Sequence, residues 1–312
     1  MIRHRLMKHI FTFFALFLTL TFNFGQINEK DTLVNVKTFW NVDDTKNYLI
    51  TTKEIRKTQD QNAHEEISYR VKIKVENIFE DEKTISWIYS DVNFNSEKFV
   101  NNPLFLVHNI PVKFVVDADG RFLRYEDLNA TLQAFINSTE KIQNKYINDE
   151  ETFKRISELA KRYASKENIV KIFEKDIRQF HLFYGTGEFI PKVNAVEYNS
   201  YMDNLFTNAP TPAKTTIKLN EIAFTGTNYI MQSFQEADKE WLANSWYNYL
   251  KELAEKLGTE APDESHLQDE ITYNVNTNSR IKDNGWLSYS VEIKKVNFQD
   301  TDYTLERRIE LE

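Results

Sequence analysis

Residues 66–75 read Glu-Ile-Ser-Tyr-Arg-Val-Lys-Ile-Lys-Val, a strict alternation of polar and apolar side chains. Successive side chains of a β-strand point to opposite faces, so this period of two gathers Ile67, Tyr69 and Val71 on one side. One apolar face and one polar face are typical of an antiparallel strand that covers a core on one side only. The stretch therefore predicts a half-buried antiparallel sheet.

The same alternation continues on both sides of this stretch. Residues 47–57 and 83–94 have it too, which predicts a meander of long strands across residues 32–95. Residues 111–125 hold two short apolar runs on either side of Asp119-Gly120. Because type I′ turns need residues that tolerate positive φ, this dipeptide predicts a hairpin.

Residues 126–182 change to a period of 3.6 and predict three amphipathic helices, with Asp149 and Ser165 as N-caps at the two breaks. A fourth helix is predicted from 237 to 257, with Gly258 just past its end. The apolar stripes are Leu128, Leu132, Phe135, Ile136, Ile142 and Tyr146; then Phe153, Ile156, Leu159, Ala160 and Tyr163; then Ile169, Ile172, Phe173, Ile177 and Phe180; and finally Leu242, Trp246, Tyr249, Leu250, Leu253 and Leu257.

The clearest candidate for a linker is the stretch 207–213, Thr-Asn-Ala-Pro-Thr-Pro-Ala. It suggests a division into residues 26–206, a β-meander with a three-helix block, and residues 207–312, strands with one long helix. The two parts could equally form one continuous domain. After the linker, strands are predicted at 214–224 and 228–234, and alternation returns from residue 270 to residue 311.

Residues 67–77 and 287–297 align without a gap, and the register holds on to Thr84 and Thr304. Two readings stay open, a pseudo-duplicated sheet and a chance likeness between amphipathic strands. Under either reading the expected fold class is α+β. It would consist of a large antiparallel sheet, curved by its twist, with amphipathic helices packed on one face.

Residues 1–25 have the parts of a secretory signal peptide. Arg3, Arg5 and Lys8 precede an uncharged apolar run from Ile10 to Phe24, which is shorter than the roughly 20 residues that a bilayer-spanning helix needs. Gly25 follows as a small cleavage-site residue. We therefore expect an exported protein, periplasmic or extracellular, without a transmembrane segment once the signal is removed.

The composition of the chain narrows the classes of partner that it is expected to bind. The formal charge of −8 becomes −11 once the three basic residues of the signal are removed, so no basic surface for nucleic acid is expected. The chain has no cysteine, which excludes disulfides and a lipoprotein anchor at the cleavage site. The abundant aromatic residues, 23 Phe and 15 Tyr, suit a packed, strand-rich interior.

A calcium-loop template places Asp117, Asp119, Gly120 and Glu126 at four of its positions. Its first position would be Val115, which offers no oxygen ligand, and the flanking runs are strand-like. We therefore interpret the segment as a plain hairpin. The histidines of the processed chain are also scattered, without the i+3 or i+4 partner that a helical zinc site needs; they are His64, His108, His181 and His266.

No catalytic signature is found. The sequence contains neither a Gly-x-Ser-x-Gly elbow nor a phosphate-binding glycine loop, so no catalytic residue, cofactor or metal is predicted and an enzyme is not expected. On the helix 237–257, Trp246 and Tyr249 are predicted to pack in the core. Trp241 and Tyr247 fall off the apolar stripe and are candidates for contact with a ligand or partner.

Several turn-level features occur together. They are a leader ending in Gly25-Gln26, the strand 69–75, the hairpin Val-Asp-Ala-Asp-Gly-Arg-Phe at 116–122, and the segment 273–281 before Gly-Trp-Leu. In this order they resemble a group of exported β-rich proteins of Gram-negative bacteria that carry a domain of unknown function. The three-helix block departs from that pattern, and the resemblance implies neither an activity nor a functional residue.

The leading functional expectation is a non-catalytic cell-envelope protein that binds a hydrophobic or lipid-like ligand between sheet and helices. The alternative is a structural or protein-interaction module of the envelope, with a solid core and a functional outer surface or edge strand. A hydrolase of envelope polymers ranks third. The ligand-binding residues are not predicted.

Overall fold

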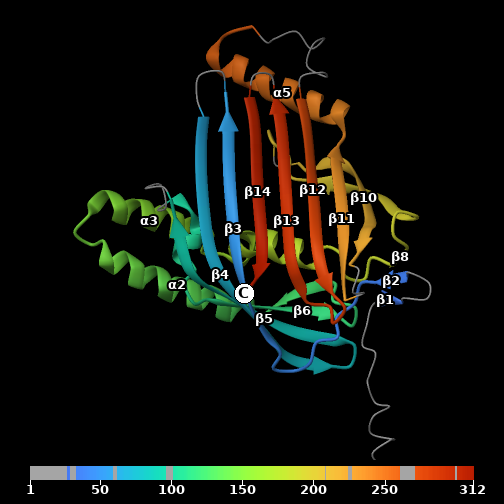
Figure 1. The fold of residues 1–312 in the computed structure, drawn as a ribbon. Coiled ribbons are helices and arrows are strands. Elements are labelled where there is room, and N and C mark those ends of the chain that lie inside the picture. The colour runs from blue at the N-terminus through green and yellow to red at the C-terminus, as the bar shows by residue number, and fades with distance from the viewer. Residues whose placement is uncertain are drawn as a thin grey trace, which may run out of the picture.

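A computed structural model describes residues 27–28, 33–58, 62–95, 101–207, 209–223, 227–260, 271–298 and 301–312. The predicted signal peptide, residues 1–25, lies outside the described residues. The described chain forms an open, curved antiparallel sheet of 11 strands with helices on one face (Figure 1). The predicted α+β class is thus confirmed. Among the described residues, no helix is long and apolar enough to cross a membrane.

The large sheet has the order β7-β6-β5-β4-β3-β14-β13-β12-β11-β10-β9. Its first five strands in sequence are β3 (Thr45–Lys57), β4 (Asn62–Phe79), β5 (Glu82–Phe94), β6 (Pro111–Asp117) and β7 (Phe122–Glu126). The others are β9 (Ala195–Met202), β10 (Thr211–Ile222), β11 (Asn228–Ala237), β12 (Ile271–Lys282), β13 (Leu287–Phe298) and β14 (Thr301–Leu311). A small second sheet contains β1 (Ile27–Asn28), β2 (Leu33–Asn35) and β8 (Glu188–Phe189).

The helices are α2 (Leu128–Lys145), α3 (Glu150–Tyr163), α4 (Lys166–His181) and α5 (Lys239–Leu257), and a 3₁₀ helix, η2, spans Pro103–Leu106. In Figure 1, α4 lies behind the central strands, α2 and α3 extend to one side, and α5 crosses the upper strand ends. The helix caps follow from the sequence. Asp149 accepts a hydrogen bond from the Thr152 amide at 3.1 Å, and Ser165 accepts one from the Asn168 amide at 3.2 Å. Both predicted N-caps are confirmed.

The last strand closes the centre of the sheet. β14 pairs antiparallel with β3, with Ile309 opposite Ile50. Strands from both sides of the predicted linker therefore belong to one sheet. The predicted hairpin is also present, as β6 and β7. There Asp117 accepts hydrogen bonds from the amides of Gly120 and Arg121 at 2.9 and 2.8 Å, and Gly120 has a φ of 100°.

The predicted linker at 207–213 is wrong at its C-terminal end, because β10 already begins at Thr211. β9, which precedes it, was not predicted. Pro212 lies within β10, opposite Tyr201 of β9 and one residue before the pairing of β10 with β11 begins at Ala213. Because β11 is not yet paired at this position, the missing N–H of Pro212 interrupts no hydrogen bond to β11.

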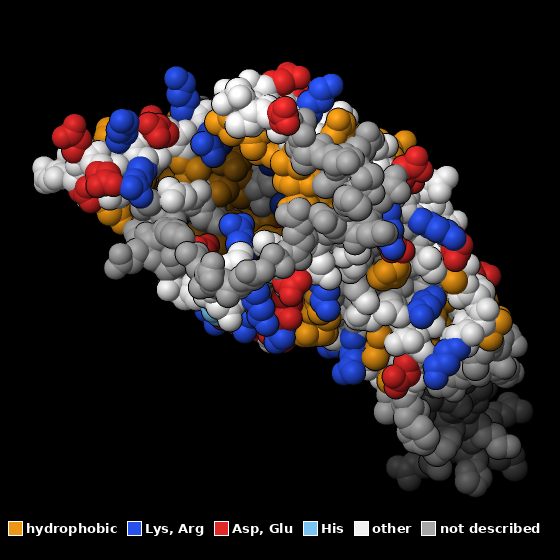
Figure 2. All heavy atoms as spheres, turned by 90° about the horizontal axis from the view of Figure 1, so that it is seen from above, with side chains coloured by type: hydrophobic (Ala, Val, Ile, Leu, Met, Phe, Trp, Pro, Cys, Tyr) orange, Lys and Arg blue, Asp and Glu red, His pale blue; other side chains and the backbone are white. Residues whose placement is uncertain are grey.

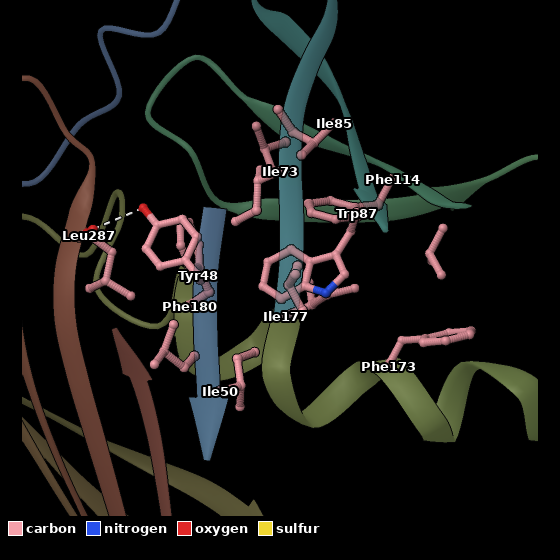
Figure 3. Packing of buried hydrophobic residues seen from close by; sticks show 14 of the residues in the cluster. Tyr48, Ile50, Ile73, Ile85, Trp87, Phe114, Phe173, Ile177, Phe180 and Leu287 are labelled. Carbon is pink, nitrogen blue, oxygen red and sulfur yellow. Dashed lines mark hydrogen bonds between the residues drawn. The ribbon is translucent and has the colours of Figure 1, made fainter. Parts of the chain in front are cut away.

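Helix α4 packs on the concave face of the sheet and forms the main core with it (Figure 3). Phe180 of α4 lies between Trp87 of β5 and Tyr48 of β3, with ring centroids 5.5 and 5.3 Å away. The Tyr48 hydroxyl donates to the carbonyl of Leu287 at 2.9 Å, so this buried polar atom is satisfied.

His181, at the end of α4, makes the stability of this core dependent on pH. Its ring is buried, Nδ1 lies 2.8 Å from the Gly120 carbonyl oxygen, and burial lowers its pKa to about 4. A histidine that stays neutral in the native state stabilises the fold above pH 6.5, and this contribution is lost as pH falls toward 4. We expect the loss to reach about 3 kcal/mol. Urea unfolding at pH 7 and pH 4.5 would measure it.

A His181→Gln variant serves as the control, because its amide can donate to Gly120 but carries no titrating proton. The stability of this variant should depend less steeply on pH than that of the wild type over the same interval. Equal slopes for the two proteins would contradict the assignment to His181.

The two segments of the apparent repeat do not turn their equivalent residues toward the same face of the sheet. Tyr69 of β4 points toward α4, where its hydroxyl donates to Asp176 at 2.8 Å. Its counterpart Tyr289 of β13 lies on the opposite face of the sheet, beside Arg308 and Glu310. Because the side-chain period of a strand is two, the aligned segments are one residue out of phase with respect to the core. The structure favours the chance-likeness reading.

Candidate ligand chamber between the sheet and its helices

On β13 the usual relation between polarity and burial is reversed. Ser290, Glu292 and Lys294 face the helices, whereas the apolar positions Val291 and Ile293 lie on the convex face. The contacts establish this orientation, because Gln179 of α4 donates to the Ser290 hydroxyl at 3.0 Å. A strand that turns its polar residues inward departs from the rule that builds a core, and such departures concentrate at functional sites.

A buried cluster of charged side chains lies under α4. Asp176 has a side chain that is 4% exposed, and Arg307 of β14 one that is 7% exposed, with Nε 3.6 Å from Asp176 Oδ1. Arg307 also donates to Glu292 at 3.2 Å. The hydroxyls of Tyr69 and Tyr89 donate to the other Asp176 oxygen at 2.8 and 3.0 Å. Five side chains from five elements, the Asp176–Arg307 ion pair included, thus form one buried polar cluster.

Burial controls the ionisation of this cluster. It raises the pKa of Asp176, against the opposing effects of Arg307 and the two tyrosine donors. It also raises the pKa of Tyr69 and of Tyr89, and the neighbouring carboxylate raises both further. Both phenols are therefore neutral donors at physiological pH.

The cluster is not fully satisfied by the residues that the structure describes. Arg307 Nη1 and Gln179 Oε1 are buried without a hydrogen-bond partner among them. Gln179 uses its amide group to reach Ser290 and the carbonyl of Arg307, at 3.0 and 3.2 Å. Unpaired buried polar atoms are costly, so their presence on the helix-facing side of the sheet marks this region as more than a packing interface.

Lys294 lies one inward position beyond Glu292 on β13. Its ammonium stands over the ring of Tyr273, 4.7 Å from the centroid, and within the described part of the chain it forms no ion pair. Burial lowers the pKa of Lys294, and Lys175 and Arg307 lower it too, while Asp203 and Glu292 raise it. The side chain is only partly buried.

Helix α5 brings an apolar surface to the same face of the sheet. It contacts β10 and β12, and Leu242 near its start is fully buried. The prediction that Tyr249 packs in the core is wrong, however, because its side chain is 41% exposed; Leu253 and Leu257 of the same stripe are 38% and 68% exposed. The stripe continues beyond the point at which the sheet can cover it.

Aromatic rings continue this surface onto the sheet. Trp246 of α5 stacks on Tyr249 with centroids 5.6 Å apart, and contacts Phe206 at 4.8 Å and Phe298 of β13 at 4.4 Å. The prediction that Trp246 packs on the core is thus confirmed in part, since it is partly buried among these rings. Trp241 and Tyr247, predicted to be free for contact, are partly buried as well.

Seen from the end at which α5 lies, the molecule is hollowed, and the hollow has a largely hydrophobic inner surface (Figure 2). The sheet positions facing it are only partly buried, in contrast to those beneath α4. We call this space the chamber. Register and partial burial make the inward-facing Val275, Lys294, Phe298, Tyr303 and Leu305 of the sheet its candidate lining, together with Phe206 and the α5 residues Trp246, Tyr249 and Leu253.

Comparisons with known proteins add little to this geometry. No protein-family model matches the sequence, and no curated protein does. A solved structure described as lipid–protein interactions in lipovitellin is similar over 87% of this chain, with 10% identity and a TM-score of 0.46. The chain spans about a quarter of that protein, 25% of its length. At this level the likeness carries no argument about the chamber.

The histidines stay scattered in the structure. His181 belongs to the core and His64 is exposed, while His266 lies outside the described residues. Among the described residues, no group of three His, Asp or Glu side chains is arranged to hold a metal ion. His108 borders a second recess of about 600 Å³, beside α2, which Lys141, Phe105 and other residues line.

Sequence reasoning missed the charged residues of the site, although a signal was present for two of them. Asp176 falls on the apolar stripe of α4, between Phe173 and Phe180. Arg307 stands between Leu305 and Ile309, at an inward position of an alternating strand. A charge on an apolar face is the observation that could have identified both. Lys294 carried no such signal, because the apolar residues that precede it in alternation on β13, Val291 and Ile293, face outward.

Proposed function

We propose that this chain is an exported, non-catalytic envelope protein that binds a lipid-like ligand in the chamber. The observation that carries the proposal is the uncovered apolar stripe of α5, on which Tyr249 and Leu253 are more than one third exposed. A stripe that continues past its covering surface is suited to a hydrophobic partner.

The energetics favour such a ligand. Each Å² of apolar surface removed from water contributes about 25 cal/mol, and an acyl chain in the chamber would cover rings of Trp246, Tyr249 and Phe298 at once. The sheet supplies a rigid floor, because every chamber position on β12, β13 and β14 is held by a strand on either side. A largely preformed apolar pocket with a few polar groups is the common form of a small-molecule site.

The alternative, an interaction module, rests on a different surface. The edge strand β9 carries Tyr198 and Tyr201, which are 43% and 71% exposed. An exposed edge strand offers backbone groups for pairing with another chain. It does not explain why charged groups are buried beside a hollow, so we rank it second.

Replacing Leu253 by Glu tests the proposal. The neutral fluorescent probe N-phenyl-1-naphthylamine should bind the wild type, and the variant should bind it at least about tenfold more weakly, because a carboxylate would have to be desolvated in the chamber. Leu253 is 38% exposed, so the variant should fold normally, which circular dichroism would verify. Titration of probe fluorescence gives both affinities.

Phe79→Glu is the matched control, since Phe79 is 70% exposed at the end of β4 and far from α5 in sequence. It should leave probe binding unchanged. No binding to the wild type, or equal weakening by both substitutions, would contradict the proposal. Native mass spectrometry of protein from its own host would then separate a bound ligand from a stoichiometric protein partner, and a chain beginning at Gln26 would support export.

A further inference from the structure

The floor of the chamber contains a cation in an otherwise apolar setting. Lys294 is opposite Val275 of β12 and Leu305 of β14, both of which face the same space. Its ammonium rests over the ring of Tyr273 rather than against a carboxylate. The residue is only partly buried.

Among the described residues, none of the surrounding carboxylates forms an ion pair with this cation. Glu292, the nearest acidic residue on the same face of β13, already accepts a hydrogen bond from Arg307 at 3.2 Å. Lys175 of α4 and Arg307 add positive potential at Lys294, and the remaining acidic influence comes from Asp203. Arg307 also has a buried Nη1 without a partner among the described residues. The positive and negative groups around the chamber floor are equal in number, but two of the three carboxylates, Asp176 and Glu292, are already paired with Arg307.

An ammonium in an apolar hollow loses hydration and needs an anion to compensate for that loss. A cation–π contact with Tyr273 offsets part of the loss. A carboxylate or phosphate would offset far more through a charge-assisted hydrogen bond. With apolar walls above and a cation below, the chamber is complementary to an amphipathic molecule.

We propose that the ligand is an acyl chain ending in an anionic head group, with the head group bound to the Lys294 ammonium and the chain lying against the aromatic wall of α5. This inference rests on the proposed function, because it specifies the ligand of the same chamber. A free fatty acid and a monoacyl phosphate share the required chemistry.

The test compares cis-parinaric acid with its methyl ester, two fluorescent probes that differ only in the charge of the head group. The wild type should bind the acid at least about tenfold more tightly than the ester, as a charge-assisted bond of about 1.5 kcal/mol or more predicts. Lys294→Met removes the ammonium and keeps the length of the side chain. It should abolish the preference by weakening the acid alone.

Lys295→Met is the matched control, because Lys295 is the next residue of the same strand and is exposed on the opposite face. It should keep the wild-type preference, and Lys294→Arg should keep most of it. Displacement of the bound acid by oleate and by 1-oleoyl lysophosphatidate, with monoolein as the neutral comparison, would distinguish carboxylate from phosphate.

Each outcome has a distinct meaning. Tight but equal binding of acid and ester to the wild type would overturn this inference and leave the proposed function intact. A preference that survives in Lys294→Met would also overturn it. If neither probe nor N-phenyl-1-naphthylamine binds, the chamber does not hold a lipid-like ligand, and both proposals fail together.

Discussion

Replacing Arg307 by Met is expected to lower the free energy of unfolding by about 3–5 kcal/mol at pH 7, because it leaves Asp176 and Glu292 without their shared counter-charge. The two tyrosine donors remain on Asp176, but neutral donors compensate a buried carboxylate only in part. Urea-induced unfolding, followed by tryptophan fluorescence, measures the change.

The variant should also respond differently to pH. Burial already raises the pKa of Asp176 in the wild type, and loss of Arg307 removes the strongest effect that opposes this rise. A carboxyl with a raised folded-state pKa favours the native state below that pKa and destabilises it above. The deficit of Arg307→Met relative to the wild type should therefore shrink as pH falls through that raised pKa.

Two further variants separate the buried pair from a general effect of losing an arginine. Arg308→Met removes the next residue of β14, which is partly exposed and pairs with Glu306 on the other face, and should change stability by less than about 0.5 kcal/mol. The double variant Arg307→Met with Asp176→Leu should regain part of the loss, since no uncompensated charge stays buried at Asp176. Equal effects of the Arg307 and Arg308 substitutions would contradict the buried-pair interpretation.

The framework of the fold was predictable because it depends on local patterns. The alternation around Tyr69 predicted the strand and its inner face, and Asp149 and Ser165 marked the helix starts as capping residues do. Pairing between β3 and β14 was not predictable in the same way. It joins segments more than 200 residues apart, and no local rule specifies which long strands become neighbours.

The chamber was harder to predict, because its residues violate the rules on which sequence reading depends. On β13 the apolar alternation of Val291 and Ile293 indicates a buried face, yet Glu292 and Lys294 are the residues that face the helices. The place of β13 in the sheet, and not its own apolar alternation, decides which of its faces is turned toward the helices. The orientation is revealed by tertiary contacts, those of Arg307 with both Glu292 and Asp176 and that of Gln179 with Ser290.

Helix α5 shows the same limit of sequence-based prediction, here for an apolar face that is not buried. Its apolar stripe is regular, so the sequence predicts a buried face along its whole length. Leu242 of this helix is fully buried, whereas Leu253 of the same stripe is 38% exposed. Periodicity tells which face of a helix is apolar, and the tertiary structure decides whether protein or a ligand covers it.

Replacing Phe180 by Ala is expected to destabilise the protein by about 3–5 kcal/mol. The side chain is 1% exposed, and its ring contacts Tyr48, Trp87 and Trp40, with centroids 5.3, 5.5 and 6.3 Å away (Figure 3). Removing it leaves a cavity between α4 and the sheet that these rigid rings cannot fill. Urea unfolding at pH 7 provides the measurement.

Phe79→Ala is the control, because the same atoms are removed from a side chain that is 70% exposed; its effect should stay below about 0.5 kcal/mol. The comparison also bears on the chamber. Phe180 and Asp176 lie one helical turn apart on α4, so loosening the core at Phe180 should also disturb the contact of Asp176 with Tyr69. If Phe180→Ala cost no more than Phe79→Ala, α4 would not be anchored by this core, and the buried charges would lack the rigid support that the chamber requires.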